Sequence, residues 1–206
     1  MSPTSTEDVE LARLLDRIFD TYHYDFRHYA GVSLKRRVGA ALAHFQCESI
    51  ARLEARVLDE PQAFAELLGY FTVQVSDLFR DATYHRALRE KVVPYLGTYP
   101  ALKIWIAGCS TGEEAYSVAI MLAEEGLLER TLIYATDINP ESLRVAEQGV
   151  YAVERFAQFS RSYLAAGGRG SLSDWYAAGA ALKPTEAKSA VHCAFTGSGR
   201  FTPPLR

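Results

Sequence analysis

The sequence predicts an α/β protein in which a small N-terminal helical bundle precedes a unit built on parallel strands. Apolar residues recur at helical spacing through about the first 70 residues, two short β-rich runs follow residue 94, and a helical stretch separates those runs. Two strands joined by a helix of this length form a βαβ unit with parallel strands and a right-handed crossover. We expect residues 1–80 to form the helical domain and residues 81–206 the α/β domain.

Four helices are expected in the N-terminal part. The first runs from Thr6 to Tyr22, with Thr6 as its N-cap, and the second covers roughly residues 33–45. Ser49 is suited to cap a third helix, and Pro61 fits the first turn of a fourth. Each helix has one apolar stripe, so we expect the four to pack as a small bundle.

The α/β part begins with a strand over residues 103–107, which is followed at once by the glycine loop, residues 108–112. A helix is expected over residues 113–125 and a second strand over residues 131–135. Asn139 and Pro140 then have the order of a helix cap and a first helical residue. The last twenty residues have neither a helical nor a strand repeat, and we expect them to be poorly ordered.

Composition excludes several classes of function. A net charge of −3 gives no overall basic field for nucleic acid or an anionic membrane, and 49% hydrophobic residues allow a buried core. The three cysteines are far apart and lack metal-ligand spacing, as do the five histidines. There is no apolar stretch of membrane length and no secretory leader. We therefore expect a cytoplasmic protein without a metal, without nucleic-acid binding and without membrane insertion. We also expect the protein to be a monomer.

The glycine loop and Asp137 form the candidate ligand site. Glycines at 108 and 112 let the backbone turn tightly and approach a ligand, and an acidic residue at the end of the second strand can accept hydrogen bonds from ribose hydroxyls. The next residues, Glu113 and Glu114, suit a cationic ligand better than a pyrophosphate. S-adenosylmethionine has a ribose, a sulfonium and an ammonium but no phosphate. The alternative is an ordinary turn between strand and helix with solvated glutamates.

Three motifs resemble the methyltransferases that esterify glutamates of bacterial chemotaxis receptors. The string Gly108-Cys-Ser-Thr-Gly-Glu-Glu-Ala-Tyr-Ser117 resembles that family's cofactor loop, and Tyr134-Ala-Thr-Asp-Ile-Asn139 resembles its second-strand motif. Upstream, Phe71-Thr-Val-Gln-Val-Ser-Asp-Leu-Phe-Arg-Asp81 resembles the signature between its helical and catalytic domains, about 30 residues before the loop. The resemblance implies a Rossmann-like, S-adenosylmethionine-dependent methyltransferase domain.

The resemblance also assigns cofactor contacts. It implies that Gln74, Ser76 and Arg80 bind the amino-acid end of S-adenosylmethionine, with Arg80 reaching the carboxylate or the reacting group as the candidate catalytic residue. Gln74 replaces the asparagine usual there but keeps an amide. Glu114 would bind the methionine ammonium and Asp137 the ribose, beside the backbone of Gly108.

Alternatives stay open for several of these side chains. Arg80 would otherwise form a surface ion pair with Asp77 or Asp81, and Ser76 would cap a helix that starts at Asp77. Cys109 lacks a histidine partner, so we interpret it as a packing residue and not as a nucleophile.

The implied reaction is displacement at the cofactor's methyl carbon by a receptor glutamate, which is already ionised and needs no general base. The implied partners are acidic helices of chemotaxis receptors, docked on a basic cluster of Arg27, Lys35, Arg36 and Arg37. The other interpretation of this cluster is a solvated helix face that is balanced by acidic residues, namely Asp20 and Asp25.

The resemblance ends near residue 176. The family's later strands, which wrap the adenine and supply a tyrosine near the methyl group, have no counterpart in residues 177–206. We therefore expect an incomplete methyltransferase domain with an atypical C-terminal tail and an exposed sheet edge. Two further functions remain possible: a noncatalytic receptor- or cofactor-binding module of the same family, and a Rossmann-like methyltransferase for a small molecule.

Overall fold

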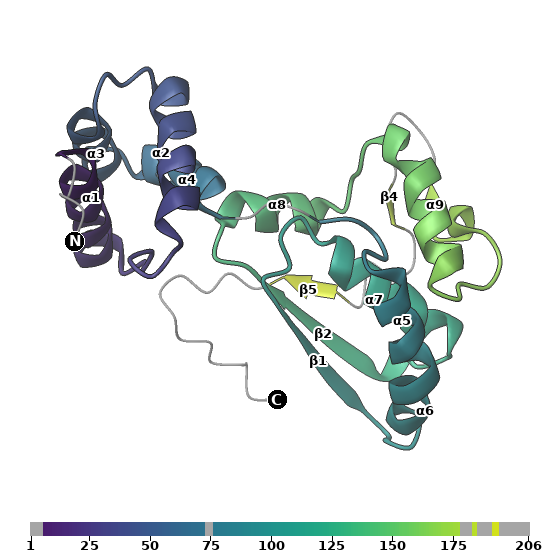
Figure 1. Cartoon of the computed structure of the whole chain (residues 1–206). Coiled ribbons are helices and arrows are strands. Elements are labelled where there is room, and N and C mark those ends of the chain that lie inside the picture. Colours follow the sequence, from purple (N-terminus) through teal and green to yellow (C-terminus); the bar gives the residue numbers. More distant parts are fainter. Residues whose placement is uncertain (1–5, 73–75, 178–182, 185–190, 194–206) are drawn as a thin grey trace. The chain divides into compact units, whose positions relative to one another are not determined.

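The computed structural model describes residues 6–72, 76–177, 183–184 and 191–193. The chain divides into two compact units, with the boundary between residues 73 and 74 (Figure 1). The boundary expected after residue 80 lies a few residues further along. None of the helices in these described ranges is both long and apolar enough to span a bilayer.

The first unit contains the four predicted helices. They are α1 (Thr6–Tyr22), α2 (Gly31–Phe45), α3 (Ile50–Asp59) and α4 (Pro61–Phe71). Ser49 caps α3 as predicted, because its side chain accepts a hydrogen bond from the amide of Arg52 at 3.3 Å. The helices share a single apolar core, in which the rings of Tyr22 and Phe64 stack with centroids 3.8 Å apart.

The second unit is built on a parallel sheet. Strand β1 (Leu102–Ala107) pairs with β2 (Thr131–Thr136) in a register that places Ala107 opposite Thr136, so both strands end together. Helix α7 (Glu113–Glu124) connects them and buries Val118, Ile120 and Leu122 in the core. The predicted βαβ unit is confirmed.

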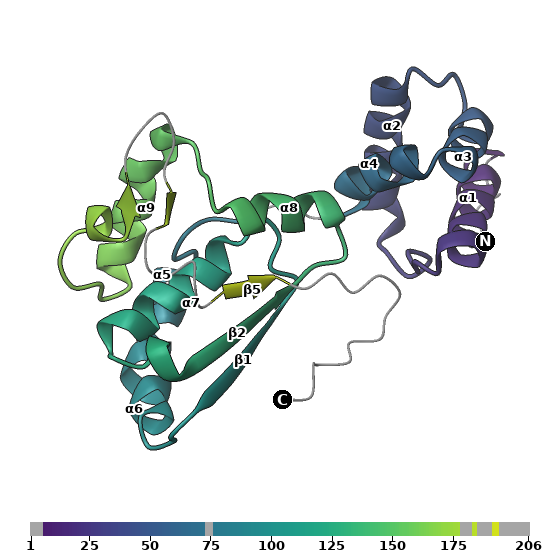
Figure 2. The same ribbon diagram turned by 180° about the vertical axis from the view of Figure 1, so that it is seen from behind.

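A third strand lies where regular structure was not expected. Strand β5 (Val191–Cys193) pairs in parallel with β2, so the sheet has the order β1-β2-β5 (Figure 2). The prediction that the last twenty residues lack regular structure is therefore wrong for these three. A run this short has too few residues to display an alternating pattern. The rest of that stretch lies outside the described residues.

The second unit also contains short helices and an antiparallel strand pair. They are α5 (Ala82–Ala87), the π-helical η1 (Leu88–Val92), α6 (Val93–Leu96), η2 (Leu128–Arg130), α8 (Pro140–Gln148), η3 (Val153–Arg155), α9 (Phe156–Ala165), η4 (Leu172–Asp174), and the antiparallel pair β3 (Tyr176–Ala177) and β4 (Lys183–Pro184). Asn139 caps α8 as predicted, accepting from the amides of Glu141 and Ser142.

The two faces of β1 differ in exposure. Leu102, Ile104 and Ile106 face the core under α7, whereas Lys103 and Trp105 on the opposite face are exposed, Trp105 by 57%. In the described part of the chain β1 has a hydrogen-bonded strand on one side only. This arrangement agrees with the expected incomplete sheet.

Candidate active site

The glycine loop is fixed by its neighbour strand. The amides of Gly108 and Cys109 both donate to the carbonyl of Thr136, at 2.8 and 2.9 Å. Gly112 has φ +93° and a Cβ there would lie 2.9 Å from the Cβ of Ala146, so a side chain does not fit. Gly108 also has a positive φ, but apart from its chain neighbours no atom of the described residues lies within 4 Å of the place where a Cβ would be. The loop is therefore packed at one end and open to a ligand at the other.

Asp137 follows β2 and holds the glycine loop. Its Oδ2 accepts from the amide of Ser110 at 2.7 Å, and its Oδ1 accepts from the amide of Asn139 at 2.8 Å. The residue is only 9% exposed. Each carboxylate oxygen has a second lone pair, so the side chain retains capacity to accept a ribose hydroxyl.

Glu113 was expected only to favour a cationic ligand and was given no specific contact, yet it is the most deeply buried charge near the loop. Its side chain is 0% exposed. Its Oε1 accepts from Arg155 Nη1 at 2.9 Å and its Oε2 from Thr111 Oγ1 at 2.6 Å. Tyr151 donates to the Thr111 carbonyl at 2.9 Å, and burial, with the nearby Glu113 charge, raises the pKa of Tyr151. Tyr151 is thus a neutral donor and not a base.

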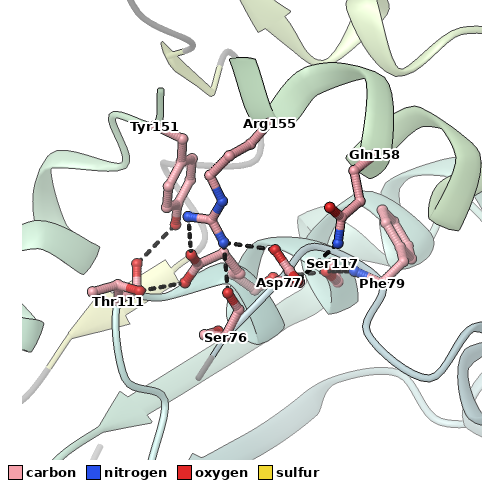
Figure 3. A network of polar contacts seen from close by, with 9 residues as sticks. Ser76, Asp77, Phe79, Thr111, Ser117, Tyr151, Arg155 and Gln158 are labelled. Atoms are coloured by element: carbon pink, nitrogen blue, oxygen red, sulfur yellow. Dashed lines mark hydrogen bonds and ion pairs between the residues drawn. The ribbon is translucent and has the colours of Figure 1, made fainter. Parts of the chain in front are cut away.

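Arg155 joins the start of α7 to the segment before α5. Its Nη2 donates to the Ser76 carbonyl at 2.6 Å and to Asp77 Oδ1 at 2.7 Å (Figure 3). The amide of Phe79 donates to Ser117 Oγ on α7 at 2.8 Å. The signature segment, residues 76–81, is therefore linked to α7 twice, through Arg155 with Glu113 and through Ser117. Sequence reasoning missed Arg155 because its partners lie about 40 and 80 residues away and no local motif marks it.

The backbone of the signature segment is unusual. Phe79 and Asp81 have φ of 53° and 57°, a region that bulky residues rarely occupy, and they flank the exposed Arg80. The alternative that Ser76 caps a helix is wrong, since the next helix, α5, begins at Ala82 with Asp81 as its N-cap. Gln74 lies outside the described residues.

Glu114 occupies the first turn of α7, and its side chain is 34% exposed. Its Oε2 lies 3.2 Å from Nε2 of the buried His85. Glu114 borders a groove of about 310 Å³, otherwise lined mainly by apolar residues of β1, α7 and the helices before β1. Arg80 and Asp137 are not among the lining residues. The cofactor contacts implied by the resemblance require Arg80, Glu114 and Asp137 to face one ligand, and this groove includes only Glu114 of the three.

Two members of the basic cluster pair with acidic residues inside the first unit. Arg27 lies 2.7 Å from Asp25, which holds the pKa of that carboxyl well below its usual range, and its guanidinium covers the ring of Phe19. Lys35 pairs with Asp8, and the hydrogen bond to Asp8 raises the pKa of the lysine. These pairs agree with a locally balanced helix surface.

The other two members differ from each other. Arg37 Nη1 donates to three consecutive carbonyls at the end of α4, those of Tyr70, Phe71 and Thr72, at 3.0–3.2 Å. Arg36 is exposed and has no ion pair with the described residues. Arg37 therefore has a structural task, while Arg36 presents its charge to solvent.

In the described part of the chain, no group of three or more His, Cys, Asp or Glu residues is arranged to hold a metal ion. Cys109 is 1% exposed and packs with Ala115, Ala135 and Leu143. This burial confirms its interpretation as a packing residue.

These features define an α/β domain with a glycine loop and an acidic residue after its second strand, preceded by a helical domain, and the comparisons with known proteins agree. Residues 9–72 match the all-alpha domain of the CheR methyltransferases, and residues 74–174 match their SAM-binding domain. The chain belongs to the CheR methyltransferase family. The cofactor of the matched domain is S-adenosylmethionine.

Relatives extend the comparison. Cher3 of Pseudomonas putida is 49% identical over 178 residues, which cover 86% of this chain and 65% of that protein. The chemotaxis protein methyltransferase of Listeria monocytogenes is 28% identical over 66% of this chain and 53% of its own length, and that of Salmonella typhimurium is 36% identical over 51% and 35%. The chain thus spans less than two thirds of each of these relatives.

The chemistry of the side chains at this site fits the cofactor. A partly exposed carboxylate on α7 suits an ammonium, and a carboxylate at the end of β2 suits ribose hydroxyls. The open approach at Gly108 lets a ligand reach the loop backbone. No basic residue belongs to the glycine loop, which agrees with a ligand that lacks phosphate.

Proposed function

We propose that this chain binds S-adenosylmethionine at the carboxyl ends of β1 and β2 and directs its methyl group to glutamate side chains of chemotaxis receptors, forming methyl esters. The observation that carries the proposal is the pair of carboxylates at this end of the sheet, Glu114 and Asp137. Asp137 follows β2 and accepts a hydrogen bond from the glycine loop. Glu114 lies in the first turn of α7, which begins directly after that loop. The names of the curated relatives, chemotaxis protein methyltransferases, support the same substrate class.

The residues of the chain would mainly bind the cofactor and align it with the receptor glutamate. When bound, the cofactor supplies a methyl carbon on a sulfonium, which is a good leaving group. Because the receptor carboxylate is already ionised at neutral pH, no general base is needed, and alignment and exclusion of water provide the catalysis. We assign Glu114 to the ammonium, Asp137 to the ribose, and Gln74, Ser76 and Arg80 to the amino-acid end, with Arg80 nearest the reacting group.

Receptor docking is the second part of the proposal. The exposed Arg36 is the member of the basic cluster that is best placed to meet acidic receptor helices, because Arg27 and Lys35 already pair within the unit. Complementary charge of this kind raises the rate of encounter more than the affinity. We further propose that the chain acts as a monomer.

A calorimetric titration with S-adenosylhomocysteine, followed by a methyl-transfer assay on an acidic receptor helix, tests the proposal. Binding and transfer together support it. Asp137→Ala should weaken both S-adenosylhomocysteine and 5′-methylthioadenosine, since both contain the ribose. Absence of binding would overturn the cofactor assignment for this chain.

A second candidate is a noncatalytic module of the same family. The observation that favours it is the open side of β1, with Trp105 exposed by 57% and one strand neighbour in the described residues. This candidate predicts that S-adenosylhomocysteine or a receptor helix binds but that no methyl ester forms. The transfer assay therefore separates the two candidates.

A further inference from the structure

His85 is a buried polar side chain that the proposed site does not yet use. It belongs to α5 and is 1% exposed. Its ring packs edge-on against Phe79 and Tyr84, with centroids 5.3 Å from each. Such a setting fits an aromatic hydrocarbon ring equally well, so packing alone does not explain an imidazole here.

The hydrogen-bonding state of His85 is incomplete. Neither ring nitrogen has a hydrogen-bond partner among the described residues. The polar atom facing Nε2 is Oε2 of Glu114, at 3.2 Å, a distance suited to a hydrogen bond although the present alignment does not make one. A buried donor without a partner is unfavourable, and hydrogen bonds in ligand-free sites often become aligned only when the ligand binds.

We infer that His85 is a positioning residue, whose Nε2–H orients the Glu114 carboxylate toward the ammonium group of the bound cofactor. The inference rests on the proposed function, in which Glu114 receives that ammonium. A carboxylate that accepts from His85 through Oε2 keeps Oε1 and the remaining lone pairs for a cation. The exposed third of the Glu114 side chain leaves room for that cation.

The position of His85 explains why this restraint is effective. Phe79, which covers one edge of the imidazole, is itself held by the hydrogen bond from its amide to Ser117 on α7, the helix that carries Glu114. The imidazole and the carboxylate therefore belong to two segments that are fastened together. A restrained carboxylate loses less conformational freedom on binding, which raises affinity.

Two ligands separate this role from a general effect on the fold. S-adenosylhomocysteine has the amino-acid end, whereas 5′-methylthioadenosine keeps the adenine and ribose but lacks the ammonium. We expect His85→Phe, which keeps an aromatic ring but removes the donor, to weaken S-adenosylhomocysteine about tenfold, or about 1.4 kcal/mol. Affinity for 5′-methylthioadenosine should not change, and His85→Gln, which retains an N–H donor, should recover much of the loss.

Calorimetric titration of the full chain and its variants gives the decision. If Glu114→Gln weakens S-adenosylhomocysteine but His85→Phe does not, the role of His85 is refuted and the proposed function survives. If Glu114→Gln has no effect, the ammonium assignment is wrong and the His85 inference fails with it. An equal loss for both ligands in His85→Phe would indicate a structural role and would also overturn the inference.

A measurement on the unaltered chain removes any dependence on how the variants fold. In ¹H–¹⁵N spectra of the imidazole groups, S-adenosylhomocysteine should slow exchange of the His85 Nε2 proton as its hydrogen bond to Glu114 forms. 5′-Methylthioadenosine should leave that exchange unchanged. The same response to both ligands would contradict the assigned role.

Discussion

Replacing Arg155 by methionine should destabilise the second unit by about 3 kcal/mol. The substitution removes the guanidinium that compensates the fully buried Glu113 carboxylate, and Thr111 Oγ1 would remain as that carboxylate's hydrogen-bond donor. Breaking a buried ion pair on one side typically costs about 3–5 kcal/mol. The Arg155 side chain is 36% exposed, so water reaches the site and we take the lower end of that range.

The assay uses the intrinsic fluorescence of the chain. Both tryptophans, Trp105 and Trp175, belong to the second unit, so their emission during urea unfolding reports on that unit alone. With a denaturant slope of about 2 kcal/mol per molar urea, a loss of about 3 kcal/mol lowers the midpoint by about 1.5 M.

The control is the ion pair of Arg144 with Glu141, whose side chains are 56% and 62% exposed. Arg144→Met should cost no more than about 0.5 kcal/mol, because exposed pairs are screened by water. The double variant Glu113→Met with Arg155→Met should be more stable than Arg155→Met alone, since no buried charge remains without a partner. Equal effects of the Arg155 and Arg144 substitutions would refute the reasoning.

Three further predictions concern the glycine loop, the basic cluster and Tyr163. Gly112→Ala should destabilise the chain by about 2 kcal/mol, as measured by thermal unfolding, because of the positive φ and the close Cβ of Ala146; a neutral result would contradict the packing of the loop. Arg36→Glu should leave stability unchanged but slow receptor methylation at low salt. Arg37→Ala should instead lower stability by about 1–3 kcal/mol, because Arg37 donates to three carbonyls. Reversed outcomes would refute the different roles of the two arginines. Burial, together with the hydrogen bond to Glu124, raises the pKa of Tyr163 to about 12, so its contribution to stability is complete below pH 10 and is lost as the pH rises toward 12. In Tyr163→Phe, this loss of stability at alkaline pH should be absent. Unfolding curves measured between about pH 9 and 12, a range that spans the ordinary and the raised pKa of tyrosine, test this expectation.

Local patterns were sufficient for most of the fold. The caps at Ser49 and Asn139 fix helix starts through hydrogen bonds to amides two or three residues away, and the alternation of strand, turn and helix gives the βαβ unit. These contacts are short in sequence, so their signals are visible in the chain itself. Strand β5 was missed because its pairing with β2 depends on residues some 60 positions away.

The motif residues of the site could be predicted from the sequence, but the contacts that hold them in place could not. The turn at Gly108 and the carboxylate of Asp137 could be inferred, because strand ends of a parallel pair meet at one edge. The partners of Glu113 could not, since Arg155 reaches it from a distant 3₁₀ segment and no spacing rule connects the two. His85 was likewise invisible, because a lone histidine in a helix has no characteristic pattern.

The hydrogen bond from the Ser110 amide to Asp137 has a thermodynamic consequence for the binding of the two halves of the cofactor. Ser110, which donates to Asp137, is separated from α7 by only two residues of the glycine loop. A displacement of Asp137, the proposed ribose acceptor, therefore also shifts the helix that carries Glu114. Substitutions at the two carboxylates should therefore show non-additive effects on cofactor affinity, although the residues contact separate chemical groups. Adenosine and methionine fragments supplied together should accordingly bind with mutual cooperativity, a thermodynamic sign that the two carboxylates act together.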